Sequence, residues 1–261
     1  MVATVKQPVS RRFGWVPDMP DHRDHRWSAP LIDPKNFPPK IDLRPKCPAI
    51  YDQLSLGSCT ANAIAGVIQF DQMRQELAEV FTPSRLFIYY NERAREHTVA
   101  ADSGASLRDG IKCVAAKGAC PETLWPYVDD GQAFAERPPQ NCYSDALQHR
   151  AVNYARLVRS ITQIKACLAA GFLFVYGFSV YKSFVTAAVA DSGIVPMPTT
   201  DEQLLGGHAV AAVGYDDSRQ TIITRNSWGS DWGVAGYCLM PYDYLLNENL
   251  SDDFWVIRMV Q

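Results

Sequence analysis

The chain has 261 residues, 47% of them hydrophobic, which is enough to form a sizeable buried core. Its 25 basic and 28 acidic side chains give a formal net charge of −3 without a basic run, so neither nucleic acid nor an anionic membrane is indicated as a partner. No apolar stretch reaches the ~18 residues of a membrane span. We expect a monomer, located in the cytoplasm or exported by a route without a signal peptide, because the N-terminus lacks the apolar core of one.

Residues 1–40 show no helical or strand periodicity, so we predict an extended N-terminal segment. It is rich in proline, which disfavours helix and sheet: Pro8, Pro17, Pro20, Pro30, Pro34, Pro38 and Pro39. The run 21–25 holds two aspartates and two histidines, as a metal site would. The interleaved Arg23 and the flanking prolines favour a solvated charged loop instead, and we predict no metal ligands.

The first predicted helix begins at Cys59. Apolar side chains follow it at a spacing of three and four, which indicates a helix with one buried face. The preceding Ser58 is placed to cap the helix through its side chain, with Gly57 forming the tight turn before it. Cys59 is therefore expected at a helix N-terminus, where the helix dipole favours a thiolate.

Further helices are predicted at 83–92, 106–117 and 161–170. The helix at 106–117 has a capping residue at each end, Ser106 and Gly118. Strands are predicted at 172–178, 208–215, 221–225, 236–240 and 255–260. The chain is thus expected to have an α+β fold, with a mainly helical lobe at 41–155 and a mainly β lobe at 156–261. Cys59 lies in the first lobe and His208 and Asn226 in the second, which predicts a site in the cleft between them.

Four side chains together have the chemistry of thiol-based acyl transfer: Gln53, Cys59, His208 and Asn226. A thiol is mostly protonated at neutral pH, and a neighbouring imidazolium and a helix N-terminus both lower its pKa. The amide oxygen of Asn226 can fix the tautomer of His208, and Trp228 can shield that hydrogen bond from water. The Gln53 carboxamide and the Cys59 backbone N–H can stabilise an oxyanion, each donor typically being worth about 3–4 kcal/mol in the transition state.

Two segments carry a family resemblance: His208-Ala-Val-Ala-Ala-Val-Gly-Tyr215 and Asn226-Ser-Trp-Gly229. They resemble the histidine and asparagine motifs of the papain family of cysteine peptidases, and His208 follows Cys59 within the roughly 130–150 residues typical of that family. Because it lacks a helical pro-domain of the eukaryotic kind, the chain resembles a bacterial branch of the family. The resemblance implies a two-lobed papain-like fold, with a helical left lobe, an antiparallel β-barrel-like right lobe and the active site in the cleft between them.

The resemblance also implies the roles of the site residues. Cys59 would be the nucleophile, His208 the acid and base, Asn226 the orienting residue and Gln53 the oxyanion donor, with no cofactor. A glycine-rich loop at 102–105 resembles the family's substrate-binding loop. The candidates for contact with a peptide or protein substrate are Gly57, Ser58, Ser103, Gly104, Gly207 and Trp228.

The chain departs from the family at Leu56, where a disulfide-forming cysteine is usual, and at Thr60, where an aromatic residue is usual. Besides Cys59 there are six cysteines, whose pairing the sequence leaves open. Cys113 and Cys167 lie in apolar-periodic stretches and are interpreted as core thiols. Oxidation is more plausible for three others in polar or proline-flanked stretches, Cys47, Cys120 and Cys142, although the missing signal peptide favours reduced thiols.

We predict an endopeptidase that hydrolyses peptide bonds through a thioester on Cys59, and two alternatives stay open. A thiol acyltransferase or amidase would use the same Cys–His pair, and a catalytically silent binding protein could use the same scaffold. Taken singly, Cys59 could be a structural thiol, His208 a core histidine and Gln53 a surface amide. Their common spacing favours the catalytic interpretation.

We predict that the N-terminal segment 1–40 is a pro-segment. Residues 11–20 form an aromatic-rich stretch beside the predicted peptidase domain at 41–261. We expect this stretch to lie in or across the cleft and to inhibit its own chain as a zymogen would. The alternative is that it packs elsewhere on the surface.

Overall fold

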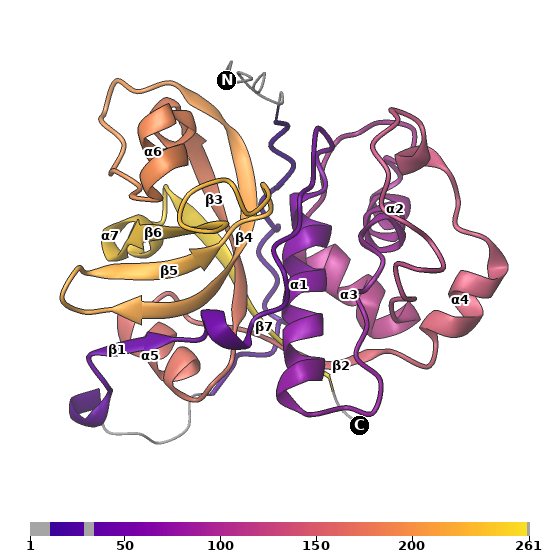
Figure 1. The fold of residues 1–261 in the computed structure, drawn as a ribbon, viewed down its shortest axis with the longest axis horizontal. Helices are drawn as coiled ribbons and strands as arrows, with labels where there is room; N and C mark the ends of the chain where they lie inside the picture. The colour runs from indigo at the N-terminus through magenta and orange to yellow at the C-terminus, as the bar shows by residue number, and fades with distance from the viewer. Residues whose placement is uncertain (1–10, 29–33, 260–261) are drawn as a thin grey trace, which may run out of the picture.

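The computed structural model describes residues 11–28 and 34–259. The chain forms two halves that lie side by side, one built around helices and the other around a sheet (Figure 1). The predicted two-lobed α+β architecture is confirmed. One helix, α1 (Cys59–Arg74), lies at the boundary and contacts strands of the other half.

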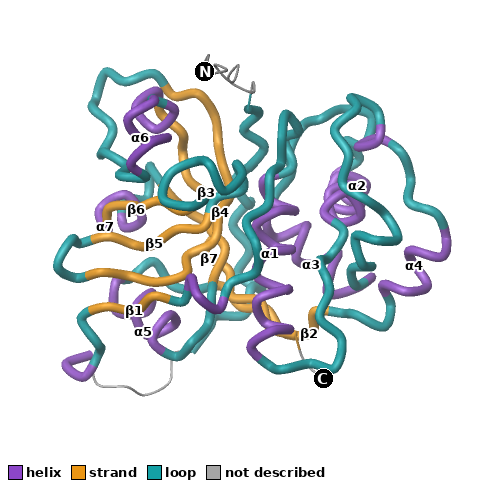
Figure 2. Tube along the Cα trace, viewed as in Figure 1, coloured by secondary structure: helices purple, strands orange, loops and turns teal. Residues whose placement is uncertain are grey.

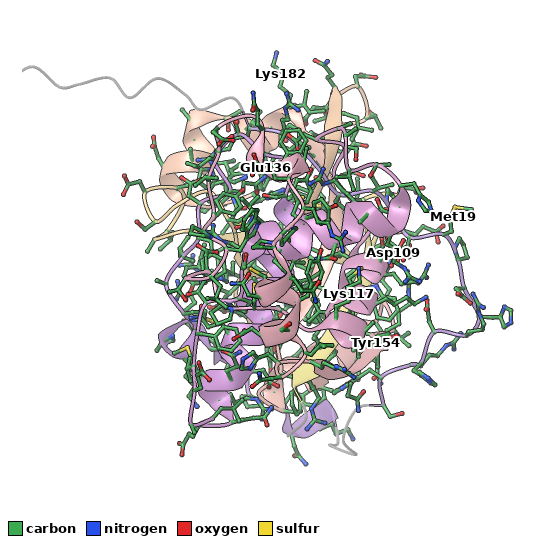
Figure 3. The ribbon with its side chains drawn as sticks, turned by 90° about the vertical axis from the view of Figure 1, so that its right-hand side faces the viewer. Met19, Asp109, Lys117, Glu136, Tyr154 and Lys182 are labelled. Atoms are coloured by element: carbon green, nitrogen blue, oxygen red, sulfur yellow. The ribbon has the colours of Figure 1, made fainter. Side chains whose placement is uncertain are left out.

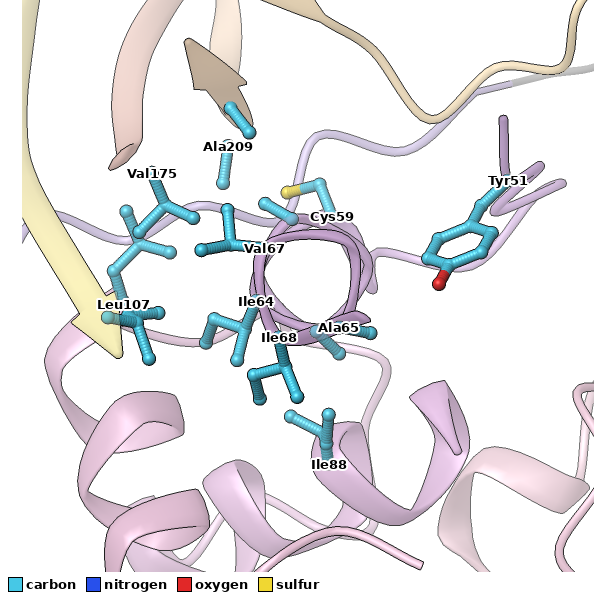
Figure 4. Close-up of a cluster of buried hydrophobic side chains, with 14 of the residues drawn as sticks. Tyr51, Cys59, Ile64, Ala65, Val67, Ile68, Ile88, Leu107, Val175 and Ala209 are labelled. Carbon is cyan, nitrogen blue, oxygen red and sulfur yellow. The ribbon is translucent and has the colours of Figure 1, made fainter. Parts of the chain in front are cut away.

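In the helical half, α2 (Arg85–Glu96) and α3 (Leu107–Lys117) pack on α1, and α4 (Gln140–Ala146) packs against α2. α1 is buried on almost every side, because small and apolar side chains occur all around it rather than on one face. Ile64 and Ile68 point toward α2 and α3, whereas Cys59 and Val67 lie toward the sheet (Figure 4). The prediction of a single buried face for this helix was therefore wrong, because almost all of its sides are buried.

The other half is a seven-stranded antiparallel sheet in the order β2-β7-β3-β4-β5-β6, with β1 paired to β4. Its strands are β1 (Lys40–Asp42), β2 (Ala151–Arg156), β3 (Phe174–Tyr181), β4 (Leu204–Asp216), β5 (Thr221–Arg225), β6 (Tyr237–Pro241) and β7 (Ser251–Met259). Helices α5 (Ile161–Ala169), α6 (Ala187–Ser192) and α7 (Tyr242–Leu246) belong to this half. Short 3-10 turns occupy Pro34–Asn36, Arg44–Lys46, Ala133–Ala135 and Lys182–Val185.

Five of the seven described strands and the longer helices were predicted, whereas β1, β2 and three short helices were missed. The strand at 221–225 is confirmed at both ends, while β4 starts at Leu204, before the predicted 208. The helices α4, α6 and α7 were not predicted, because each has at most seven residues and so too few turns to show a period. Among the described helices, none is both long and apolar enough to cross a membrane.

Two local predictions need correction. Ser58 occupies the N-cap position of α1, but its side chain makes no capping bond; its hydroxyl instead contacts Tyr127 and Asn62 in the helical half. Cys120 and Cys142, predicted in polar or proline-flanked stretches, are both buried against Phe87, because the loop that carries Cys120 and the helix α4 that carries Cys142 pack on α2. Within the described residues all seven cysteines are free thiols.

Residues 11–28, hereafter the arm, run between the two halves as loop without helix or extended sheet (Figure 2). This confirms the extended conformation predicted for that stretch. Isolated bridges tie the arm to both sides, Trp15 to Ala105 and Arg26 to Arg156. The buried Asp18 anchors the arm beyond Trp15: its carboxylate accepts from the Trp255 ring N–H and from the Arg108 backbone N–H.

Candidate active site

Cys59 begins α1 and is fully buried. Its side chain lies on the face of the helix toward Ala209 of β4 (Figure 4). Backbone N–H groups of Ala209, Gly14 and Thr60 point at the sulfur. The thiol is therefore enclosed by its own helix, by the strand residue that follows His208, and by the arm.

His208 lies on β4 opposite Phe178 of β3 and is held through one ring nitrogen. Its Nε2 is 2.8 Å from Oδ1 of Asn226, and that oxygen also accepts from the Ser227 backbone N–H at 2.8 Å. Because this atom accepts from Ser227, it is the carbonyl oxygen, so Nε2 of the ring carries the proton. Nδ1 is buried and has no hydrogen-bond partner among the described residues, which leaves its lone pair free to receive a proton.

An aromatic layer covers the His208–Asn226 bond. The Trp228 ring lies 5.0 Å from the His208 ring, centroid to centroid, and the Phe178 ring lies 5.7 Å away on a near-perpendicular plane. These rings exclude water from the hydrogen bond, as predicted for Trp228, and so hold the imidazole in one orientation.

Gln53 lies in the loop before α1, and its carboxamide is oriented from both ends. Oε1 accepts from the Ser227 hydroxyl at 2.7 Å. Nε2 donates to the Leu56 carbonyl at 2.9 Å and is 3.4 Å from the carbonyl oxygen of Arg12 in the arm. A backbone carbonyl oxygen of the arm thus lies against the amide group that was predicted to donate to an oxyanion.

The protonation of the pair differs from the thiolate–imidazolium predicted from the sequence. Burial raises the pKa of the Cys59 thiol to about 12, outweighing the backbone N–H groups that lower it. Burial also lowers the pKa of His208 to about 4, although the bond to Asn226 acts in the opposite direction. With the arm in place both groups are neutral at pH 7, because desolvation outweighs the backbone hydrogen bonds at the sulfur and the Asn226 bond at the ring.

The family comparison agrees with this geometry: the model of the papain family cysteine proteases matches residues 37–250. The chain belongs to the papain family. It is a cysteine peptidase, as the motifs around His208 and Asn226 predicted.

Several relatives of this papain-family chain cover most of its length. A peptidase C1-like protein of Acanthamoeba polyphaga mimivirus is 43% identical over 276 residues, 97% of this chain and 88% of that protein. The cathepsin B-like CP1 of Giardia intestinalis is 30% identical over 223 residues, covering 79% and 68% respectively. The crystal structure of xylellain, a cysteine protease from Xylella fastidiosa, superposes with a TM-score of 0.92 at 43% identity, covering 98% and 99%.

More distant structures share the fold. Procathepsin L 3 from the larval midgut of Tenebrio molitor has a TM-score of 0.71 at 17% identity, covering 96% of this chain and 77% of that one. The papain-like fold predicted from the sequence is confirmed by these superpositions. The β half differs from a closed barrel, because β2 and β6 end the strand order without pairing to each other among the described strands.

Four of the six predicted substrate-contact residues touch the arm. Gly207 accepts from the Trp15 backbone N–H at 2.9 Å, and the Trp228 carbonyl accepts from Arg11 at 3.1 Å. Gly57 and Gly104 allow close backbone approach: a Cβ on Gly104, whose φ is +74°, would lie 2.0 Å from the Gly14 carbonyl oxygen. These residues line the cleft in which the arm lies.

The other two predicted contacts are placed differently. The Ser58 hydroxyl is turned into the helical half, and the Ser103 hydroxyl donates to the carbonyl of Gly104. Sequence reasoning also missed Asp102, although it lies in the quoted glycine-rich loop. Its carboxylate accepts from the Gly57 backbone N–H at 3.0 Å and pairs with Arg12 of the arm at 3.0 Å.

In the charged run at 21–25, Asp24 anchors the arm to the domain, whereas Asp21 pairs within the run. Asp24 forms a salt bridge with Arg108 at 2.6 Å, and Asp21 pairs with Arg23 at 2.7 Å. Both carboxylates are therefore engaged by arginines. In the part of the chain that the structure describes, no group of three or more histidine, cysteine, aspartate or glutamate residues is arranged to hold a metal ion.

Proposed function

We propose that this papain-family peptidase is an endopeptidase that forms a thioester on Cys59 and is held inactive by its own arm. The observation that carries the proposal is the path of the arm through the site. The Arg12 carbonyl oxygen is 3.4 Å from Gln53 Nε2, the Gly14 N–H points at the Cys59 sulfur, and the Trp15 N–H donates to Gly207.

Cys59, His208, Asn226 and Gln53 divide the chemistry. The Cys59 sulfur gives its proton to Nδ1 of His208 and attacks the scissile carbonyl carbon, while Gln53 Nε2 and the Cys59 N–H donate to the resulting oxyanion. His208 then gives that proton to the leaving amine. In the second half it takes a proton from water, which attacks the thioester and restores the thiol. Asn226 keeps the imidazole in the tautomer that both steps need.

Cleavage within a chain is supported by the room on both sides of Cys59. The arm extends past the thiol in both directions, from Arg11 and Phe13 near Trp228 to Trp15 and Val16 beside Ala105. Next to Phe13 there is a pocket of about 460 Å³ whose lining includes Leu205, Trp228 and Trp232. A cleft that holds several residues on each side of the nucleophile suits an endopeptidase.

The arm blocks the site by filling it. The Arg12 carbonyl lies against Gln53 Nε2 and a backbone group of Gly14 lies beside the sulfur, so the arm takes the space that a scissile bond would need. The same contact excludes water and leaves the thiol and the imidazole neutral. The arm therefore inhibits in two ways, by occupying the cleft and by preventing the ion pair.

Gly14→Leu in the full-length chain tests the proposal. A Cβ on Gly14 would lie 1.8 Å from the Gly57 carbonyl oxygen, so any side chain there forces the arm out of the cleft. We expect this variant to hydrolyse a casein or peptide-library substrate at least ~10-fold faster than the native chain, because the fraction of molecules with a released arm should rise by at least that factor. Adding Cys59→Ala should abolish the gain.

Met19→Leu is the matched control. Met19 belongs to the same arm, but its side chain is 80% exposed at the edge of the molecule (Figure 3). This variant should be as inactive as the native chain. Equal rates for Gly14→Leu and the native chain would refute inhibition by the arm. An amide product formed with an added amine, in place of the free acid, would show an acyltransferase instead of a peptidase.

A further inference from the structure

The side chain of Trp15 fills a flat pocket between two strands of the β half. Its walls are Gly177 of β3 and Gly207 of β4. A Cβ on Gly177 would lie 1.9 Å from indole Cε2, and a Cβ on Gly207 would lie 2.7 Å from indole Cε3. Neither glycine has a φ in the left-handed region, so the backbone itself does not require glycine there. The two missing side chains make a slot with room for a bicyclic ring.

A single carboxylate lies at the far end of this slot. Asp253 of β7 accepts from the indole Nε1 of Trp15 through Oδ2 at 3.0 Å, and its side chain is fully buried. Oδ2 also accepts from the Asp18 backbone N–H at 2.8 Å, while Oδ1 accepts from Arg156 at 2.8 Å. Both donors to Oδ2 within the described residues thus belong to the arm, whereas Arg156 belongs to the domain.

A β-bulge turns Asp253 into the slot. Val175 pairs with Trp255 and Gly177 pairs with Asp252, so β7 carries one residue more than β3 between these pairs. Asp253 lies in this insertion with a φ of +57°, a conformation that costs an ordinary side chain free energy. Bulges re-aim side chains at functional sites. The fold therefore keeps a strained residue whose carboxylate points at the ring nitrogen of the occupant.

We propose that this slot is a specificity pocket for tryptophan in the substrate, with Asp253 as the acceptor for the indole N–H. The inference rests on the proposed endopeptidase activity and names the side chain that its cleft selects. When the arm leaves, Oδ2 loses both donors, and a buried carboxylate oxygen without a donor is costly. An indole restores one of them and fills the slot.

Other side chains fit this slot less well. Phenylalanine and leucine can fill part of the volume but supply no donor to Oδ2, so they leave the carboxylate unpaired. A lysine or arginine supplies donors to a carboxylate that already accepts from Arg156. It also leaves the flat walls at Gly177 and Gly207 without a ring to pack on them.

The pocket is tested in the full-length Gly14→Leu chain with peptides that differ by one residue. A single tryptophan is moved through an otherwise Ala/Ser/Gly peptide, and the cleaved bond is mapped by mass spectrometry. We expect the cut to follow the tryptophan at a fixed spacing. Replacing tryptophan by 3-benzothienylalanine, in which sulfur takes the place of the ring N–H, should lower kcat/KM about 10-fold or more, as the loss of a hydrogen bond to a charged group does.

Two variants separate the carboxylate from the shape of the slot. Asp253→Gly suits the left-handed backbone and removes the acceptor, so tryptophan and benzothienylalanine peptides should then be cleaved equally well. Gly177→Ala narrows the slot. Made alone in the native chain, it should also displace Trp15 from the slot. We expect this single variant to cleave small-residue peptides faster than the native chain while losing the preference for tryptophan, a combination that a merely structural role of Gly177 would not give.

The outcomes that overturn the proposal are distinct from those that overturn the peptidase. Any one of three results would refute the pocket. The cleaved bond does not move with the tryptophan, or peptides with arginine or lysine are cleaved faster than those with tryptophan, or benzothienylalanine causes no loss of kcat/KM. If Gly14→Leu cleaves no peptide, the endopeptidase proposal fails, and the pocket is then decided by binding. In that case calorimetry on the Cys59→Ala, Gly14→Leu chain must show tighter binding of a peptide with the sequence of residues 11–20 than of its Trp→Phe version.

Discussion

At the scale of single residues, Gln53 shows how one carboxamide is positioned for a charge that is not yet there. Its oxygen is fixed by the Ser227 hydroxyl, and its N–H group lies against the arm carbonyl of Arg12. A group preorganised in this way acts in the transition state more than in the ground state.

We therefore expect Gln53→Ala, in the Gly14→Leu chain, to lower kcat by about 10²–10³-fold with little change in KM, the typical effect of losing one oxyanion donor. Ser227→Ala removes only the bond that orients the carboxamide and keeps the N–H donor, so its loss of kcat should stay clearly smaller. Steady-state kinetics measures both, with thermal unfolding as a check on folding. A change confined to KM, or equal losses in the two variants, would contradict this role.

Residues of the site differ in how visible they are in the sequence. Cys59, His208 and Asn226 stand in motifs with family spacing, and the structure places His208 and Asn226 2.8 Å apart. The neutral state of Cys59 and His208 could not be predicted in this way. It depends on burial beneath residues 11–16, and burial is a property of the assembled molecule that no local motif carries.

At the scale of elements, the arm is held less by its own structure than by buried charges. The Asp18 carboxylate is fully buried and accepts from the Arg108 backbone N–H at 3.0 Å and from the Trp255 ring at 2.9 Å. Arg156 lies within 3.6 Å of the same carboxylate. These contacts lie beyond Trp15 along the arm and make none of the bonds to Cys59 or Gln53.

Asp18→Ala should therefore release the arm from the cleft, although Asp18 makes no bond to Cys59 or Gln53. Removing one partner of a buried charge network typically costs about 3–5 kcal/mol, so we expect at least ~10-fold more peptidase activity and a lower Tm than in the native chain. Asp21→Ala is the control, because Asp21 pairs with Arg23 in an exposed loop of the same arm. A lower Tm for Asp18→Ala without any gain in activity would refute the anchoring role.

The helices were predictable in proportion to their length and period, because the three of at most seven residues were missed. The helix at 107–117 carried its caps in the sequence, Ser106 and Gly118, and both lie where they were expected. The bulge at Asp253 had no such signal in the sequence, because an aspartate in a strand does not by itself predict a left-handed φ. The path of the arm depends on contacts between segments far apart in the chain, which periodicity does not encode.

At the scale of the whole molecule, docking of the arm is coupled to the protonation of the catalytic pair. In the docked state the pKa of the Cys59 thiol is raised to about 12 and that of His208 is lowered to about 4, in both cases by burial. A solvated thiol ionises from ~8.5 and a solvated imidazole gains its proton below ~6.5. The released state therefore gains from ionised Cys59 at high pH and from protonated His208 at low pH, and the docked state is favoured most between these values.

This coupling predicts the reactivity of the thiol. Alkylation by iodoacetamide requires the thiolate, so Cys59 in the native chain should react very slowly at pH 7. In Gly14→Leu it should react at least ~10-fold faster, and the inflection of its rate against pH should fall below ~8.5, because solvation and an adjacent imidazolium both favour the thiolate. The rates are measured at each cysteine by mass spectrometry after proteolysis of quenched samples.

Cys47 provides an internal control within the same samples. Cys47 is partly exposed, and its thiol donates to the Leu43 carbonyl, which is not part of the arm. Burial raises the pKa of its thiol to about 11. Its slow alkylation should be the same in both chains, because releasing the arm does not change its surroundings. If Cys59 and Cys47 accelerate together, Gly14→Leu has loosened the whole fold. If Cys59 reacts equally fast in both chains, the arm does not control the ionisation of the nucleophile.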